Sequence, residues 1–231
     1  MVIRMLFLVF LLIINAPAFA VTIAVIGTGN VGMALGTELA EQGHAIIYGS
    51  RSPSGLKALT LAKKTKGDAT TATQKEAAAS AEIVVLAVPG MVVEEVVNGL
   101  GDLSGKLIID ATNPLIVDNA MHFTFGVATS NGEIVQAAAP EAFVVKAFNT
   151  ISWQSMIDPD ESDGPLYVPI VGNNKAAKLR VASFVEKMGL VPFDLGPIEV
   201  AHWTEYSAVV GLNNQFSERT NFDLVFRKIE D

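Results

Sequence analysis

A glycine-rich hexapeptide near the amino end has the residue types and spacing of an anion-binding turn. It reads Gly27-Thr28-Gly29-Asn30-Val31-Gly32, follows an apolar run over residues 21–26 and precedes a stretch with helical periodicity. The first glycine permits a tight turn, the second lets the backbone approach a ligand closely, and the third lets the helix pack on the strand. N–H groups at the helix start then hold an anion, so the pattern predicts a diphosphate site. A tight strand-to-helix turn without a ligand is the alternative.

A second candidate site comes about twenty residues after this turn. Folds that bind NAD place an acidic residue there to accept the ribose hydroxyls, whereas this chain has Ser50 and Arg51. A carboxylate would repel a ribose 2′-phosphate, but a hydroxyl and a guanidinium donate to it, and the guanidinium also stacks on adenine. The pair therefore favours NADP(H) over NAD(H), with Lys57 as a weaker auxiliary contact. The plainer alternative is a solvated arginine in a surface loop.

Three further loops are expected at the same edge of the sheet, each directly after a predicted strand. Their candidate residues are Val88, Pro89, Thr112, Asn113, Asn149 and Trp153. Ligands of parallel sheets bind beyond the carboxyl ends of the strands, so these loops should flank the ribose and the nicotinamide. Ordinary loop architecture is the alternative for each of them, and Lys146 is open to a structural interpretation as the partner of a carboxylate.

The elements that must position these residues alternate along the chain. From residue 21 onward, short β-branched runs alternate with helix-like stretches, which predicts a three-layer α/β Rossmann fold with a doubly wound, mainly parallel sheet of about eight strands. Candidate strands cover residues 21–26, 45–48, 69–71, 83–88, 107–110, 143–148, 167–171 and 191–194. Candidate helices cover residues 31–42, 56–64, 73–79, 92–101, 175–188 and about 200–212. We expect residues 21–231 to form a single nucleotide-binding domain with a short helical tail.

The composition limits the classes of protein to which the chain can belong. Half of the 231 residues are hydrophobic and 17% are charged, which excludes a disordered chain. The formal net charge of -8 argues against nucleic acid as a partner, and it means that local dipoles and one or two cations must hold an anionic ligand. The absence of cysteine excludes disulfides, thiolate metal ligands and cysteine nucleophiles. The acidic stretch 158–163 is interpreted as a solvated loop, so no metal site is expected.

The first twenty residues have the features of a secretory signal. A charged start is followed by an apolar run over residues 5–14 and by small residues that end at Ala20. The run is too short for a stable membrane span. An extension upstream of a native start at Val21 is the alternative. The protein would be cytoplasmic in that case, and exported or membrane-tethered if the signal is real, so residues 1–20 are left out of the fold argument.

Taken together, these motifs resemble one known family, the NADPH-dependent coenzyme F-420 reductases. The resemblance runs from residue 21 to about Glu205 and depends on an ordered set of segments: 23–32, 49–51, 86–89, 110–115, 144–150, 171–172 and 194–197. The family implies NADP contacts at or near Thr28, Gly29, Asn30, Val31, Ser50, Arg51, Val88, Thr112 and Trp153. It also implies a deazaflavin, coenzyme F-420, stacked over the nicotinamide in a cleft below Asn149. Direct hydride transfer between the two rings requires alignment more than a general base.

Two departures from the family leave the acceptor open. Family members usually have two aspartates where this chain has Asn173 and Asn174, and the tail after Leu212 is unusually polar and charged. A small-molecule redox acceptor remains the expected partner, since related domains reduce flavins or pass electrons onward in metalloreductases of the STEAP type. A non-enzymatic NADPH sensor is one rival.

An imine reductase is a second rival, but it requires a long helical dimerisation domain, and the residues after Val200 are too few for one. A homodimer through the terminal helix is conceivable without any sequence feature that supports it. The three histidines, His44, His122 and His202, are interpreted as structural or solvent-exposed, so we name no catalytic residue.

Overall fold

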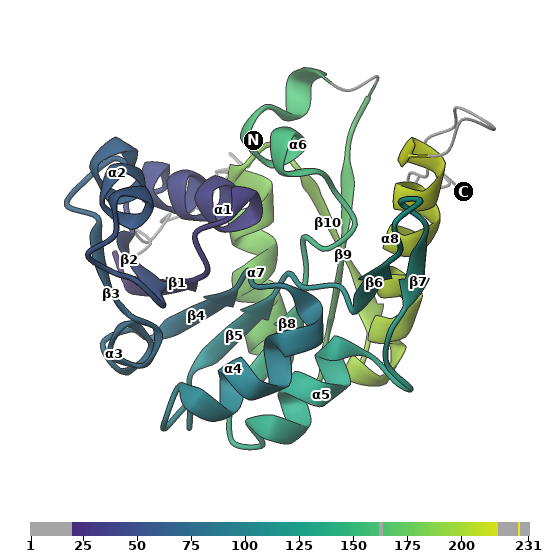
Figure 1. The fold of residues 1–231 in the computed structure, drawn as a ribbon, viewed down its shortest axis with the longest axis horizontal. Coiled ribbons are helices and arrows are strands. Elements are labelled where there is room, and N and C mark those ends of the chain that lie inside the picture. The colour runs from purple at the N-terminus through teal and green to yellow at the C-terminus, as the bar shows by residue number, and fades with distance from the viewer. Residues whose placement is uncertain (1–19, 162–163, 217–225, 227–231) are drawn as a thin grey trace, which may run out of the picture.

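The computed structural model describes residues 20–161, 164–216 and 226, so the predicted leader lies almost wholly outside the described residues. A central sheet has the strand order β10-β9-β8-β5-β4-β1-β2-β3, with helices on both faces (Figure 1). Its strands are β1 Thr22–Ile26, β2 Ala45–Ser50, β3 Thr70–Thr73, β4 Ile83–Leu86, β5 Leu107–Asp110, β8 Phe143–Lys146, β9 Tyr167–Gly172 and β10 Val191–Gly196. Neighbouring strands are parallel except β8 and β9. The predicted eight-stranded, mainly parallel α/β Rossmann fold is confirmed.

The helices lie in two layers that cover the faces of the sheet. They are α1 Asn30–Glu41, α2 Leu56–Lys64, α3 Gln74–Ala79, α4 Val93–Gly99, α5 Asn131–Ala138, α6 Trp153–Ile157, α7 Lys175–Lys187 and α8 Ala201–Phe216, with 3-10 turns at Gly90–Val92, Pro159–Glu161 and Ile198–Val200. Alternate strand residues face opposite layers, which is why central strands such as β4 are apolar throughout.

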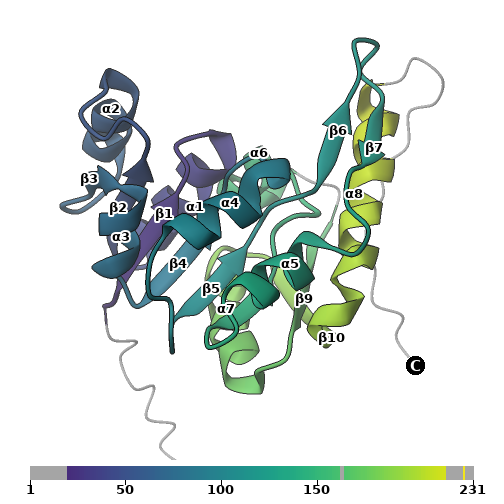
Figure 2. The same cartoon turned by 60° about the horizontal axis from the view of Figure 1, so that its bottom comes forward.

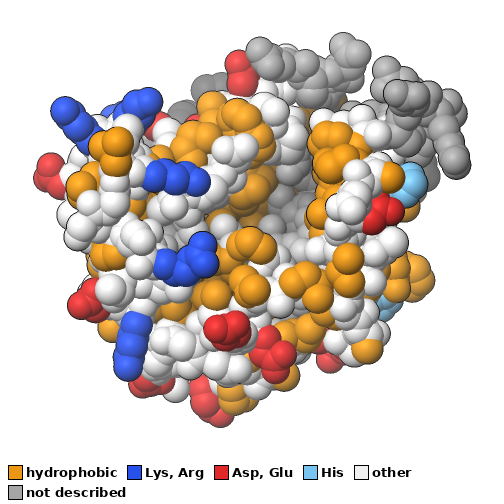
Figure 3. All heavy atoms as spheres, viewed as in Figure 1, with side chains coloured by type: hydrophobic (Ala, Val, Ile, Leu, Met, Phe, Trp, Pro, Cys, Tyr) orange, Lys and Arg blue, Asp and Glu red, His pale blue; other side chains and the backbone are white. Residues whose placement is uncertain are grey.

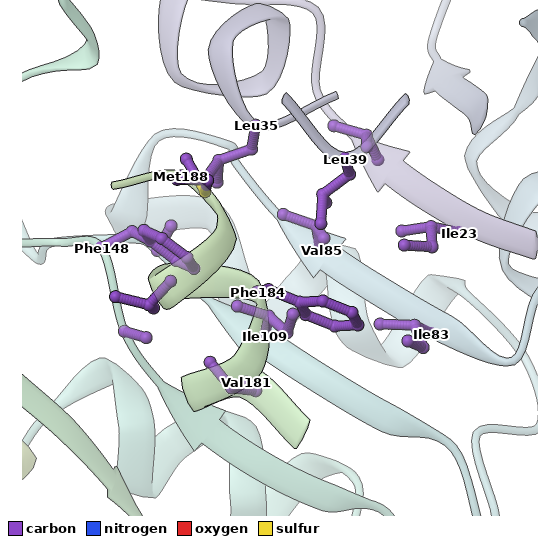
Figure 4. Close-up of a cluster of buried hydrophobic side chains, with 14 of the residues drawn as sticks. Ile23, Leu35, Leu39, Ile83, Val85, Ile109, Phe148, Val181, Phe184 and Met188 are labelled. Atoms are coloured by element: carbon purple, nitrogen blue, oxygen red, sulfur yellow. The ribbon is translucent and has the colours of Figure 1, made fainter. Parts of the chain in front are cut away.

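One buried cluster joins α1 and α7 to the sheet. Figure 4 shows Leu35 and Leu39 of α1 and Phe184 of α7 packed over strand residues that include Val85 and Ile109. Each of these side chains is at most 4% exposed. Burying a side chain of this size stabilises the fold by about 1.5–3 kcal/mol, so the cluster fixes α1 on the sheet.

The sheet changes direction at β9. Val171 of β9 pairs with Lys146 of β8, and the two strands run antiparallel. The chain therefore turns back beyond the carboxyl end of β8 to enter β9. Helix α6 lies in this connection and packs against α1. Trp153 at the start of α6 is partly buried and packs against the hydrophobic cluster to which α1 contributes.

The sequence did not predict a small antiparallel hairpin, β6 Leu115–Val117 with β7 Phe123–Phe125. Figure 2 shows this hairpin extending past the sheet beside α8. Helices α5 and α6 were also missed. Two predicted strands, 83–88 and 143–148, were too long. Strand β4 ends before Pro89, which has no N–H group to donate to a neighbouring strand, and β8 ends before Phe148, whose φ lies in the left-handed region. The terminal helix is longer than the predicted 200–212 and reaches Phe216.

Among the described residues, none of the helices combines the length and the apolar character needed to cross a bilayer.

Candidate functional site

The structure brings the loops that carry the predicted site residues to one edge of the sheet. Strand β1 lies between β4 and β2, and successive strands are added outward on both sides of it. Ligands of such sheets bind where the order reverses, beyond the carboxyl ends of the strands. The hexapeptide turn lies there after β1, with Ser50 at the end of β2. Val88 and Pro89 follow β4, Thr112 and Asn113 follow β5, and Asn149 and Trp153 follow β8.

Close backbone contacts fix the shape of the turn between β1 and α1. Gly27 has φ +118, and a Cβ on it would lie 2.2 Å from the Ala87 carbonyl oxygen. A Cβ on Gly32 would lie 2.2 Å from the carbonyl oxygen of Gly27. By contrast, a Cβ on Gly29 would meet nothing within 4 Å. The turn is therefore closely packed on its inner side and open at Gly29.

The open side of the turn is suited to an anion. Gly29 is the N-cap of α1, makes no side-chain capping hydrogen bond, and is followed by a first helical turn without acidic residues. Thr28, Asn30 and Val31 surround it. The first N–H groups of a helix have no partner inside the helix, and the helix dipole adds positive potential. The residues present thus fit a diphosphate, and only a glycine leaves that space open.

Charge is distributed unevenly around Ser50 and Arg51. Residues 42–62, which run from before β2 into α2, contain two cations, Arg51 and Lys57, and no carboxylate, although the whole chain has a net charge of -8. Arg51 is exposed. The Ser50 hydroxyl oxygen accepts a hydrogen bond from the Ser52 N–H at 3.1 Å, which leaves its O–H free to donate. This corner of the edge can donate to a phosphate in an otherwise acidic protein.

The loops after β4 and β5 are held together by Asn131 at the start of α5. Its amide donates to the Gly90 carbonyl at 3.1 Å and to the Thr112 hydroxyl at 2.8 Å. Thr112 in turn donates its N–H and its O–H to Asp110. Every polar group of Thr112 is bonded inside the protein, since its carbonyl accepts from Lys146. Thr112 therefore shapes the loop that ends β5, and only its methyl group is left for another contact.

A buried network of charges lies directly beneath these loops. Lys146 Nζ lies 2.8 Å from Asp110 Oδ2 and 2.6 Å from Glu205 Oε1, and all three side chains are fully buried. The structural interpretation of Lys146 as the partner of a carboxylate is confirmed. With both carboxylates ionised, the network carries one net negative charge.

Glu205 joins α8 to this network and to α5. Its carboxylate accepts hydrogen bonds from the N–H groups of Asn131 at 3.0 Å and Gly132 at 3.2 Å, the first two of α5. Burial raises the pKa of Glu205 above its ordinary value, while the charge of Lys146 acts in the opposite direction. Glu205 thereby fixes α8, which follows the sheet in the chain, to the carboxyl edge.

The hairpin and α8 form one wall of a hollow beside this edge. Asn213 of α8 exchanges two hydrogen bonds with the backbone of Phe123, and Phe125 stacks on Tyr206 at 4.1 Å between ring centroids. Figure 3 shows the surface hollowed between this wall and the side that carries α1 and α6, with hydrophobic side chains on both rims. A planar apolar ring could enter there.

The sequence reasoning missed the contributions of α5. Asn131 was assigned no role, although it connects two loops of the site. A signal was present, because Ser130 and Glu133 have the spacing of a helix start and the Ser130 hydroxyl does accept from the Glu133 N–H. Thr150 lies in the segment 144–150 that carries the resemblance, but it was not among the predicted site residues; its hydroxyl is buried in the structure.

Comparison with known proteins places the chain among NADP-dependent reductases. Residues 22–114 match the family model described as NADP oxidoreductase coenzyme F420-dependent. The chain is 28% identical over 210 residues to the F420-dependent NADP reductase of Methanothermobacter marburgensis, which covers 84% of this chain and 91% of that protein. It is 30% identical over 194 residues to metalloreductase STEAP3 of Rattus norvegicus, covering 83% of this chain. The chain spans little more than a third of that protein, 37% of its length.

A solved structure agrees with these relatives. The crystal structure of a protein from Arthrobacter sp. FB24, provisionally assigned as an F420-dependent NADP reductase, superposes with a TM-score of 0.82 at 31% sequence identity. The match covers 90% of this chain and 100% of that one. An imine reductase from a Pseudomonas species superposes with a TM-score of 0.64 at 17% identity, which establishes a likeness of fold alone.

Proposed function

Because the chain belongs to the family of coenzyme F420-dependent NADP oxidoreductases, we propose that it transfers a hydride between NADPH and a deazaflavin or related flavin-like acceptor. The turn around Gly29 binds the diphosphate, and Ser50 with Arg51 binds the 2′-phosphate. NADPH, when bound, supplies the hydride. The observation that carries the proposal is the open N-cap position of α1 at Gly29, next to strand β2, which ends at Ser50 and is followed by the exposed Arg51.

The chain's own residues then have positioning tasks rather than acid–base tasks. The loops at Val88, Pro89, Asn113 and Asn149 align the nicotinamide end of the cofactor along the edge. The wall formed by the β6–β7 hairpin and α8 holds the second ring over it and keeps water away. Alignment of this kind accounts for a large part of the acceleration of a two-ring reaction, so a catalytic triad is not required.

Replacing Arg51 tests the identity of the cofactor. Wild type should bind NADPH more tightly than NADH, and Arg51→Ala should raise the Kd for NADPH by roughly tenfold to a hundredfold, because a charge-assisted hydrogen bond to phosphate is lost. Calorimetric titration of wild type and of Arg51→Ala with each nucleotide gives the four dissociation constants. Arg180→Ala, which removes an exposed arginine of α7, serves as the control. Equal affinity of wild type for the two nucleotides would remove the 2′-phosphate assignment.

Rapid mixing tests the acceptor. NADPH and oxidised deazaflavin, mixed with the protein in a stopped-flow spectrometer, should lose their absorbance together in a single hydride transfer. Bound NADPH without bleaching of the deazaflavin would reject this acceptor. Turnover with a flavin and a ferric chelate instead would favour the second candidate, a nucleotide-binding part of a metalloreductase system, for which the 30% identity to STEAP3 is the supporting observation. Binding without any turnover would favour an NADPH sensor.

A further inference from the structure

Helix α2 carries two of its three leucines on the side that faces away from the sheet. Its inner side consists of Ala58, Ala62 and the partly buried Leu61. On the outer side, Leu56 is 83% exposed and Leu59 is 49% exposed, and their spacing of three residues makes them neighbours on one face of the helix. Among the residues that the structure describes, no large hydrophobic side chain is more exposed than Leu56. A helix that packs on a sheet normally turns its larger apolar residues inward, so the outward leucines indicate a contact outside the chain.

Three lysines accompany these leucines on the outer side of α2. Lys57, Lys63 and Lys64 are exposed, and none of them forms an ion pair within the described part of the chain. Lys63 follows Leu56 by seven residues, so it lies two turns further along the same face. The nine residues of α2 include no carboxylate, although the whole chain has a net charge of -8. The outer side of the helix therefore combines apolar and cationic side chains and has no charge of the opposite sign.

The carboxylates that are nearest in the sequence do not cancel this positive charge. Glu41 of α1 is paired with Lys66, whose Nζ lies 2.6 Å from Glu41 Oε2. Asp68, in the loop between α2 and β3, is a single negative charge against the three lysines of the helix. Figure 3 shows that the lysines and arginines visible in this view lie on the side of the molecule that carries α2, away from α8. A negatively charged surface would be attracted to this side, although the protein as a whole repels it.

We propose that the outer face of α2, formed by Leu56, Lys57, Leu59, Lys63 and Lys64, docks on an anionic lipid bilayer. The lysines lie against the headgroups, and the leucines enter the boundary between the headgroups and the acyl chains. A bilayer fits this face better than a nucleic acid does, since phosphates gain nothing from the leucines. It also fits better than an acidic protein, because leucines that project from a helix need a matching pocket on a folded partner, whereas a fluid bilayer gives way around them.

Docking through α2 leaves the hollow beside the carboxyl edge open. Helix α2 packs beside β2 and β3, at one end of the sheet, and strands β1, β4, β5 and β8 lie between these strands and β9. Figure 1 shows α2 at one end of the molecule and the wall of the hollow, made by α8 and the β6–β7 hairpin, at the other. The proposed contact with lipid is therefore independent of the reaction proposed above, and either can fail without the other.

Sedimentation of the full chain with lipid vesicles tests the proposal. Wild type should bind vesicles of phosphatidylcholine mixed with phosphatidylserine at least about tenfold more tightly than vesicles of phosphatidylcholine alone. Binding should weaken steeply between about 0.1 M and about 1 M salt, as the Debye length falls from about 10 Å to about 3 Å. Lys63→Gln combined with Lys64→Gln should weaken binding to the mixed vesicles about thirtyfold, and Leu56→Ser combined with Leu59→Ser about tenfold.

Matched substitutions on α7 provide the controls. Leu179 is 62% exposed, so Leu179→Ser removes a comparable leucine, and Lys175→Gln combined with Lys187→Gln removes the same charge. Neither control should change the affinity for mixed vesicles by more than about twofold. All the substituted positions are exposed, so each variant should fold like wild type, which circular dichroism would check.

Three results would overturn the proposal. Equal losses in the α2 and α7 lysine variants would mean that net charge alone governs binding. Binding to both kinds of vesicle that neither α2 variant weakens would place the lipid contact elsewhere in the chain. Retention of wild type on immobilised polyglutamate, without affinity for either kind of vesicle, would assign the face to an acidic protein instead.

Discussion

Lys146→Met is expected to lower the free energy of unfolding by about 3–5 kcal/mol. The substitution preserves length and apolar volume but leaves Asp110 and Glu205 buried without their cation, and both are fully enclosed. It also leaves the Thr112 carbonyl without its donor. Urea denaturation followed by circular dichroism would measure the loss.

An exposed ion pair of the same length provides the control. Lys66 Nζ lies 2.6 Å from Glu41 Oε2, but the two side chains are 62% and 49% exposed. Lys66→Met should therefore change the unfolding free energy by no more than about 1 kcal/mol. If the two variants lost the same stability, the network beneath the site would not have the structural role that its burial indicates.

Gly29→Ala is expected to weaken NADP(H) binding about a hundredfold or more while costing less than about 1 kcal/mol of stability. Gly29 has φ -79 and ψ -172, which any residue adopts, and its Cβ would meet no protein atom. The added methyl would instead occupy the space that the proposal assigns to the diphosphate. Calorimetric titration and thermal unfolding of the same sample would measure both effects.

Gly27→Ala should behave in the opposite way. The same methyl two residues earlier would collide with the Ala87 carbonyl and would force alanine to φ +118, so we expect a loss of about 3 kcal/mol or more in stability. Binding that survives in Gly29→Ala would contradict the placement of the diphosphate, whatever the stability of the two variants.

The central strands of the sheet could be predicted from the sequence because they are apolar runs buried on both faces. Runs such as Ile83–Leu86 and Leu107–Asp110 leave little other choice in a chain of this composition. The β6–β7 hairpin could not be predicted, since its strands have three residues each and Ile116 and Val117 are half exposed. Its stability comes from contacts with α8, which lies far away in the sequence.

The candidate site likewise has one part that the sequence predicts and one part that it does not. The turn at Gly27–Gly32 and the cationic pair at Ser50 and Arg51 are local patterns, and their positions at the carboxyl edge follow from the strands before them. The bonds of Lys146 and Asn131 depend on partners up to 74 residues away, and no local pattern specifies which partner will be chosen. Burial decides those pairings, and burial is known only once the fold is known.

The reversal of strand direction at β9 separates two parts of the molecule whose sequences can diverge at different rates during evolution. The nucleotide turn depends on β1, β4 and α1, whereas the crossing from β8 to β9 contributes α6 and the loop over the edge without adding a strand to that half. Insertions or deletions in the crossing would reshape the rim of the hollow while the register of the central strands stayed the same. A fold built in this way can change during evolution what enters the hollow while it keeps the glycine-rich turn.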